Sequence, residues 1–179
     1  MKLRLFLRVL LWVVWLSATL VACTPPANES IPLASFTENY VTVSVSLERD
    51  PGEKYFLSAT FLPPDGYHLY SKDISPNGVD GLGRPTRIEL TEDSLITPLS
   101  TLTESVKAQE PDFEPKELFV YPAGAVTLRL PVELPPGNHW IDEEFKITYM
   151  ACSAYQCKPP VEGKIVQVRF PCASVFGHP

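Results

Sequence analysis

Two cysteines, Cys152 and Cys157, are separated by only four residues in the stretch from Tyr149 to Pro160. A close pair of thiols can form a structural disulfide, exchange electrons as a redox-active disulfide, or ligate a metal. A bridge closing so short a loop limits the unfolded chain little and stabilises the fold by roughly 2 kcal/mol. A metal needs two further ligands, and none of the histidines shows ligand spacing: His68, His139 and His178. The spacing alone leaves the redox site and the structural staple both open.

The amino terminus has the three parts of a bacterial secretion signal. Lys2, Arg4 and Arg8 make a positive start, an apolar run follows from Val9 to Leu16, and a region of small residues ends the segment. The chain is therefore expected to leave the cytoplasm, for a compartment where close cysteines can oxidise.

The signal ends in Leu-Val-Ala-Cys at residues 20–23, which resembles the lipobox of bacterial lipoproteins. Cys23 is then the lipidated first residue of the mature protein, held in the cell membrane or the outer membrane by its acyl chains. The alternative is an uncleaved membrane anchor over residues 5–22, which Arg8 interrupts and which leaves the Leu-Val-Ala-Cys ending unexplained.

Composition narrows the class of protein. Without residues 1–22, which hold three basic and no acidic side chains, the chain keeps 12 Lys and Arg against 21 Asp and Glu, a net charge of −9. This charge argues against nucleic acid as a partner. The remaining 157 residues or so suit one domain, and 19 prolines among them disfavour long helices.

Short alternating segments predict an all-β fold. In residues 41–48, for example, apolar and polar side chains alternate with period two, which is typical of a half-buried strand. Turn residues separate the segments, so an immunoglobulin-like β-sandwich is the leading architecture and a jelly roll the alternative. Residues 99–109 are either weakly helical or an extended connection. The expected strands cover residues 41–47, 55–61, 67–70, 86–90, 118–121, 126–132, 145–150 and 164–170.

Four regions follow from these patterns. Residues 1–22 are the signal peptide, 23–35 a proline-rich tether, 36–172 the sandwich, and 173–179 a tail.

The last two expected strands restrict how the cysteines pair. If residues 145–150 and 164–170 form an antiparallel hairpin, Cys152 and Cys157 lie at its loop end and Cys172 at the opposite end. Seven residues at about 3.3 Å each place Cys172 more than about 20 Å away, whereas a disulfide needs Cα atoms within about 7 Å. We therefore expect Cys152 to pair with Cys157 and Cys172 to remain a buried, inert thiol.

Several motifs resemble one family in order and spacing. Thr148 to Cys152, followed by Cys157-Lys158-Pro159-Pro160, resembles the Tyr-x-x-Cys…Cys-x-Pro-Pro segment of the amino-terminal periplasmic domain of the thiol:disulfide interchange protein DsbD. Residues 66–71 (GYHLYS), 81–86 (GLGRPT) and 128–132 (LRLPV) are similar to three further stretches of that family. The resemblance covers about residues 36–171.

The resemblance implies an immunoglobulin-like sandwich whose cysteine pair receives electrons from a membrane-embedded reductase and passes them to thioredoxin-like exported proteins, without a cofactor. Cys152 and Cys157 match the redox pair, and Cys157 matches the cysteine that attacks the target disulfide. Asp112, Phe113 and Glu114 occupy the region of a cap loop that shields the pair, and Tyr67 and Tyr70 are expected to line the site or to be ordinary strand aromatics.

The chain departs from the family in two ways. Family members often have adjacent aromatics and then glycine in the cap loop, whereas here Phe113 stands alone between Asp112 and Glu114, and Pro115 follows. No eight-helix membrane section or Cys-x-x-Cys thioredoxin domain follows, so a separate membrane reductase is the expected source of electrons. The alternative function is a non-catalytic envelope binding module in which the disulfide only braces a loop.

Overall fold

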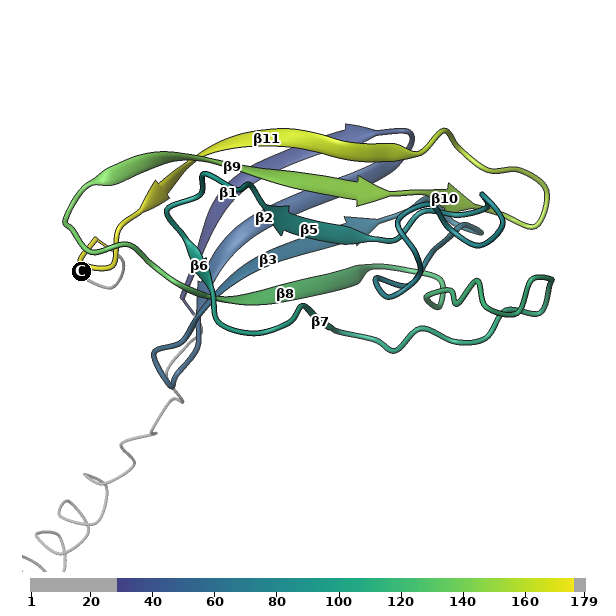
Figure 1. The fold of residues 1–179 in the computed structure, drawn as a ribbon, viewed down its shortest axis with the longest axis horizontal. Coiled ribbons are helices and arrows are strands. Elements are labelled where there is room, and N and C mark those ends of the chain that lie inside the picture. The colour runs from purple at the N-terminus through teal and green to yellow at the C-terminus, as the bar shows by residue number, and fades with distance from the viewer. Residues whose placement is uncertain (1–28, 176–179) are drawn as a thin grey trace, which may run out of the picture.

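The computed structural model describes residues 29–175, which are all-β and contain no helix (Figure 1). Every strand pairing within this part of the chain is antiparallel. The larger sheet has the order β1-β2-β3-β8-β6 with β7 also on β8, the second has the order β11-β9-β5, and β4 pairs with β10. The strands are β1 (Glu29–Glu38), β2 (Val41–Arg49), β3 (Tyr55–Leu62), β4 (His68–Leu69), β5 (Arg87–Leu90), β6 (Thr97–Pro98), β7 (Thr103–Glu104), β8 (Val126–Glu133), β9 (Trp140–Tyr149), β10 (Ala151–Cys152) and β11 (Val161–Pro171).

The two main sheets pack face to face over one core, which confirms the predicted β-sandwich. Alternate residues of each long strand point inward, as the period-two pattern requires. On β2 the apolar set from Val41 to Leu47 is fully buried, while the intervening side chains are partly or fully exposed. Phe61 of the larger sheet and Phe145 and Phe170 of the second sheet are also fully buried within this core.

The predicted hairpin of the last long strands is confirmed. β9 and β11 pair from Tyr149 opposite Val161 to Trp140 opposite Pro171. Cys152 and Cys157 follow the end of β9, and Cys172 follows β11 at the other end of the hairpin (Figure 1). Cys172 is buried and free, as the strand lengths predicted.

Three sequence expectations need correction. The tether was expected to extend to Ser35, but Glu29 to Ser35 belong to β1, where Ile31, Leu33 and Ala34 pack against the core. Pro32 is tolerated because β1 is an edge strand and its register shifts between Pro32 and Ala34.

The other two corrections concern connections. Residues 118–121 are not a strand, since Val120 makes only isolated bridges to Tyr70 and Gln109. Residues 99–109 are extended and include β7, so the helical alternative is wrong. The expected signal peptide, Cys23 and residues 176–179 of the tail lie outside the described residues. No helix in the described part of the chain is long and apolar enough to span a membrane.

Candidate functional site

Cys152 and Cys157 form a disulfide, which confirms the predicted pairing. The two residues differ in exposure: Cys152 lies on β10 and is 2 % exposed, whereas Cys157 is exposed in the loop that leads to β11. Ser153 shapes the loop between them, because its hydroxyl accepts hydrogen bonds from the amides of Tyr155 and Gln156 at 3.2 Å each. The loop therefore presents Cys157 to solvent and keeps Cys152 against the protein.

Strand β4 brings a second set of side chains to the disulfide. The turn before β4 closes through a hydrogen bond from the Tyr67 amide to the Pro64 carbonyl, with Gly66 at φ 78°, a conformation that glycine adopts without strain. In the β4–β10 pair, His68 lies directly opposite Cys152. The tight turn thus places His68 beside the buried half of the disulfide.

Contacts on the outer side hold the cysteine loop. The Gln156 side chain donates a hydrogen bond of 2.7 Å to the Tyr67 hydroxyl. The Lys158 ammonium lies 4.2 Å from the ring centroid of Tyr40 and 5.3 Å from that of Tyr67. Asn39, in the turn between β1 and β2, donates a hydrogen bond of 2.8 Å to the Pro159 carbonyl. These contacts fix the loop on both sides of Cys157.

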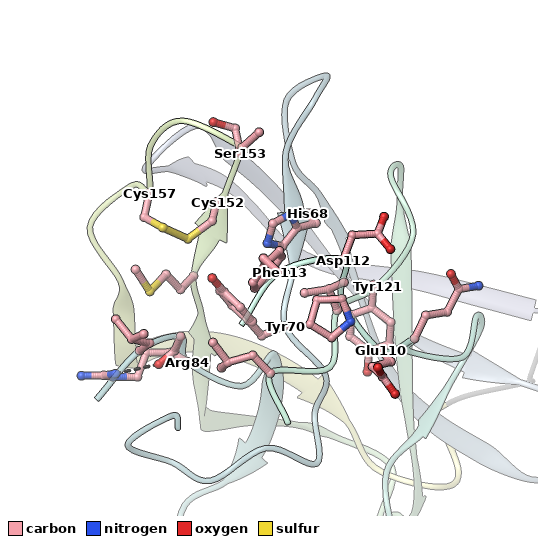
Figure 2. Close-up of a pocket in the computed structure, with 18 of the residues that line it drawn as sticks. His68, Tyr70, Arg84, Glu110, Asp112, Phe113, Tyr121, Cys152, Ser153 and Cys157 are labelled. Carbon is pink, nitrogen blue, oxygen red and sulfur yellow. Dashed lines mark hydrogen bonds between the residues drawn. A yellow bond between two sulfur atoms is a disulfide. The ribbon is translucent and has the colours of Figure 1, made fainter. Parts of the chain in front are cut away.

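A cavity of about 930 Å³ lies beside the disulfide (Figure 2). Its lining is mainly apolar and aromatic next to the cysteines, with acidic side chains contributed by residues 110–114. The lining includes Cys152, Cys157, His68, Tyr70, Phe113 and Leu118. The cavity therefore gives a concave, mainly apolar surface next to the disulfide, of the kind that binds a ligand.

The glycine-rich loop at residues 81–86 supports the cavity wall. A Cβ atom on Gly83 would lie 2.9 Å from the Leu118 side chain and 3.2 Å from the Tyr70 ring, so only glycine fits without a shift. Thr86 donates its hydroxyl to the Tyr70 carbonyl at 2.8 Å. The Arg84 guanidinium donates to the carbonyls of Gly81 and Gly83 in this loop and of Asn77 before it, and it pairs with Glu162. This loop therefore positions Tyr70.

The expected cap residues lie at the same cavity. Asp112, Phe113 and Glu114 all line it and are exposed. The ring of Phe113 stacks on His68, with centroids 5.6 Å apart and planes at 26° (Figure 2). Phe113 thus contacts His68, the residue opposite Cys152. The role of Phe113 as a cap remains a prediction.

The two expected tyrosines occupy different places. Tyr70 is buried, lines the cavity and meets His68 edge to face at 5.4 Å between centroids. Burial raises the pKa of its hydroxyl. Tyr67 is not part of the cavity lining and instead holds the cysteine loop through Gln156.

His68 is the site residue that sequence reasoning missed, since the sequence suggests no role for it beyond a strand position in the motif and a metal ligand without ligand spacing. Its Nε2 atom is buried and makes no hydrogen bond to any group in residues 29–175. Burial lowers the pKa of the imidazole, which favours the neutral form. The signal that could have found it is its place in the motif of residues 66–71, one residue before a buried leucine of β4.

The third cysteine of the described region lies apart from this site. Cys172 is buried near His139, with its Sγ atom 3.9 Å from Nε2, at the opposite end of the β9–β11 hairpin. No group of three or more His, Cys, Asp or Glu side chains in residues 29–175 is placed to hold a metal ion. Comparisons of the chain with family models, with curated proteins and with solved structures found no match.

Proposed function

We propose that this protein is a lipid-anchored, extracytoplasmic thiol:disulfide exchange protein, which relays electrons from a membrane-embedded reductase to thioredoxin-like or other exported proteins. The observation that carries the proposal is the unequal exposure of the two bridged cysteines, beside a cavity lined by aromatic side chains. Exchange needs one sulfur that an incoming thiolate can reach and a second that resolves the mixed disulfide.

The unequal exposures support a different role for each cysteine. In the reduced protein, the Cys157 thiolate attacks a target disulfide, and one target sulfur leaves as a thiolate. Cys152 then attacks the Cys157 sulfur, the second target sulfur leaves, and the Cys152–Cys157 disulfide forms. The target gains two electrons and the protein loses two. A dithiol of the membrane reductase restores the reduced pair by attacking the exposed Cys157 sulfur.

Trapping of the mixed disulfide tests this assignment. A Cys152→Ser variant of the full chain, in a Cys172→Ala background, should accumulate covalent adducts with exported proteins that a reductant releases. The matched Cys157→Ser variant, which keeps only the buried cysteine of the pair, should form far fewer. Equal or absent adducts in both variants would contradict the assignment.

A non-catalytic envelope binding module is the second candidate. The contacts from Tyr67, Tyr40 and Asn39 that hold the cysteine loop favour it, because a braced loop also suits a binding surface.

The reduction potential separates the two candidates. A value below about −300 mV marks a structural disulfide, and a higher value supports exchange. A Cys152→Ser/Cys157→Ser double variant should keep partner binding only if the disulfide is a brace.

A further inference from the structure

The unpartnered nitrogen of His68 lies beside the disulfide, and the proposed exchange steps leave it unused. We propose that His68 is the general base that accepts the proton of the Cys152 thiol when the mixed disulfide on Cys157 is resolved. This inference rests on the proposed exchange function and adds a residue to its chemistry.

Strand pairing places the two side chains together. His68 and Cys152 are directly opposite each other in the antiparallel β4–β10 pair. Residues in that relation point to the same face of the pair, with Cβ atoms about 4.5–5.5 Å apart. The close-up shows the imidazole next to Cys152, on the cavity side (Figure 2).

The ring is held but its nitrogen is left without a partner. Phe113 stacks on one face of the imidazole and Tyr70 meets it edge to face. Buried polar atoms in proteins are nearly always hydrogen-bonded, so an exception calls for an explanation. In the disulfide form Cys152 carries no proton. Reduction creates a thiol there, and that thiol supplies the donor that Nε2 lacks.

The surroundings of His68 keep its imidazole neutral, so the ring can accept a proton. Burial keeps the imidazole neutral and therefore able to accept a proton. The titratable and charged groups at the same cavity are Tyr70, Arg84, Glu110, Asp112, Glu114 and Tyr121. Three of these are exposed acids, and the Arg84 charge is paired with Glu162, so no cation of the cavity lining opposes protonation of the ring.

The Cys152 thiol gives its proton to His68 Nε2, and the Cys152 thiolate forms a bond to the Cys157 sulfur. The bond between Cys157 and the target sulfur breaks, and the target leaves as a thiolate. The imidazolium then returns its proton to that thiolate or to water.

The reaction of the reduced protein with Ellman's reagent isolates this step. Attack by Cys157 releases one coloured thiolate in a phase that depends on reagent concentration, and attack by Cys152 releases a second in a phase that does not. In a Cys172→Ala background, His68→Phe should slow the second phase at pH 7 on the order of 10²-fold and leave the first phase nearly unchanged. The difference should narrow above about pH 8.5, where a thiol ionises without help.

His139→Phe is the matched control, because it makes the same substitution at the opposite end of the hairpin and should alter neither phase. An unchanged second phase in His68→Phe would overturn the role of His68 and leave exchange intact. A wild-type protein that shows no second phase would overturn exchange, and the base with it.

Proton NMR of the wild-type protein covers the case in which His68→Phe does not fold. The His68 ring resonances should titrate at lower pH in the reduced protein than in the oxidised one, because a hydrogen bond donated by the Cys152 thiol stabilises the neutral imidazole. The His139 resonances serve as the internal reference. Identical His68 titration in both redox states would also overturn the proposal.

Discussion

At the residue scale, Tyr40 occupies a backbone conformation that proteins usually give to glycine. Asn39 and Tyr40 form the turn between β1 and β2 with φ values of 48° and 68°. A left-handed tyrosine costs about 1 kcal/mol or more, since its Cβ crowds the next carbonyl. The Tyr40 ring lies over the Lys158 ammonium, and such a contact contributes about 0.5–1 kcal/mol at an exposed site. The free-energy cost of the left-handed backbone and the stabilisation from the cation–π contact therefore nearly cancel.

Replacement of Tyr40 by glycine separates these two contributions. Tyr40→Gly should change the free energy of unfolding by less than about 1 kcal/mol in the wild type, because relief of strain offsets the lost contact. In a Lys158→Met background, where no cation is present, the same change should stabilise the fold by about 0.5–1 kcal/mol more. Urea denaturation of the four proteins gives the coupling. The same effect in both backgrounds would show that the ring does not hold Lys158.

Sequence reasoning found the cysteine chemistry more readily than its surroundings. The Cys152–Cys157 pairing follows from the strand lengths, which exclude Cys172 by distance, together with the expected lipidation of Cys23. The turn at Asn39 escaped notice because tyrosine, unlike glycine, does not signal a left-handed position. His68 escaped because its importance depends on strand register, which joins β4 to β10 across more than 80 residues.

At the element scale, a buried carboxylate ties the connection after β5 to strand β9. Glu143 is 5 % exposed, and it accepts hydrogen bonds from the Ser94 hydroxyl at 2.8 Å and the Leu95 amide at 2.9 Å. Hydrogen bonds to a charged group contribute about 1.5–3 kcal/mol. This tie fixes the path of the chain between the two sheets.

Removal of this carboxylate should therefore destabilise the fold. We expect Glu143→Ala to lower the free energy of unfolding by about 2–3 kcal/mol in urea denaturation, because Ser94 and the Leu95 amide lose their acceptor. Glu144→Ala, a change at the exposed neighbour, is the matched control and should cost no more than about 0.5 kcal/mol. Both variants should react with Ellman's reagent as the wild type does. A loss as small as that of Glu144→Ala would refute the role of the tie.

The long strands could be predicted from sequence and the short ones only in part. β2, β8 and β9 carry clear alternation, which survives because one face of each is buried. The start of β1 looked like a tether because Pro32 is unusual in a strand, and only its edge position makes it acceptable. Residues 118–121 have a strand-like pattern, but a strand also needs a continuous partner, which a local pattern does not reveal.

At the scale of the whole molecule, the sandwich places its candidate chemistry at one end and leaves the core to hold the fold. The disulfide, cavity and His68 gather where β9 ends, while Cys172 and His139 lie at the other end. The core spans both sheets and includes the fully buried rings of Tyr121 and Tyr149. The hydroxyl groups of these two tyrosines ionise at alkaline pH. The free energy of unfolding of the sandwich should therefore depend on pH in that range.

Burial raises the pKa of both hydroxyls, and the neighbouring Glu104 and Glu38 raise those of Tyr121 and Tyr149 respectively. A group whose pKa is raised by folding stabilises fully below its unfolded pKa, near 10, and loses that contribution as the pH rises further. The free energy of unfolding should therefore fall above about pH 10, by up to about 1.4 kcal/mol per pH unit for each tyrosine.

Urea denaturation of the oxidised Cys172→Ala protein between about pH 9 and 11.5 measures this slope. Tyr149→Phe, which removes the hydroxyl that donates to the Glu38 carbonyl, should reduce it, whereas Tyr155→Phe at the exposed tip of the cysteine loop should not. An equal slope in Tyr149→Phe and the wild type would mean that the buried hydroxyl does not govern alkaline stability.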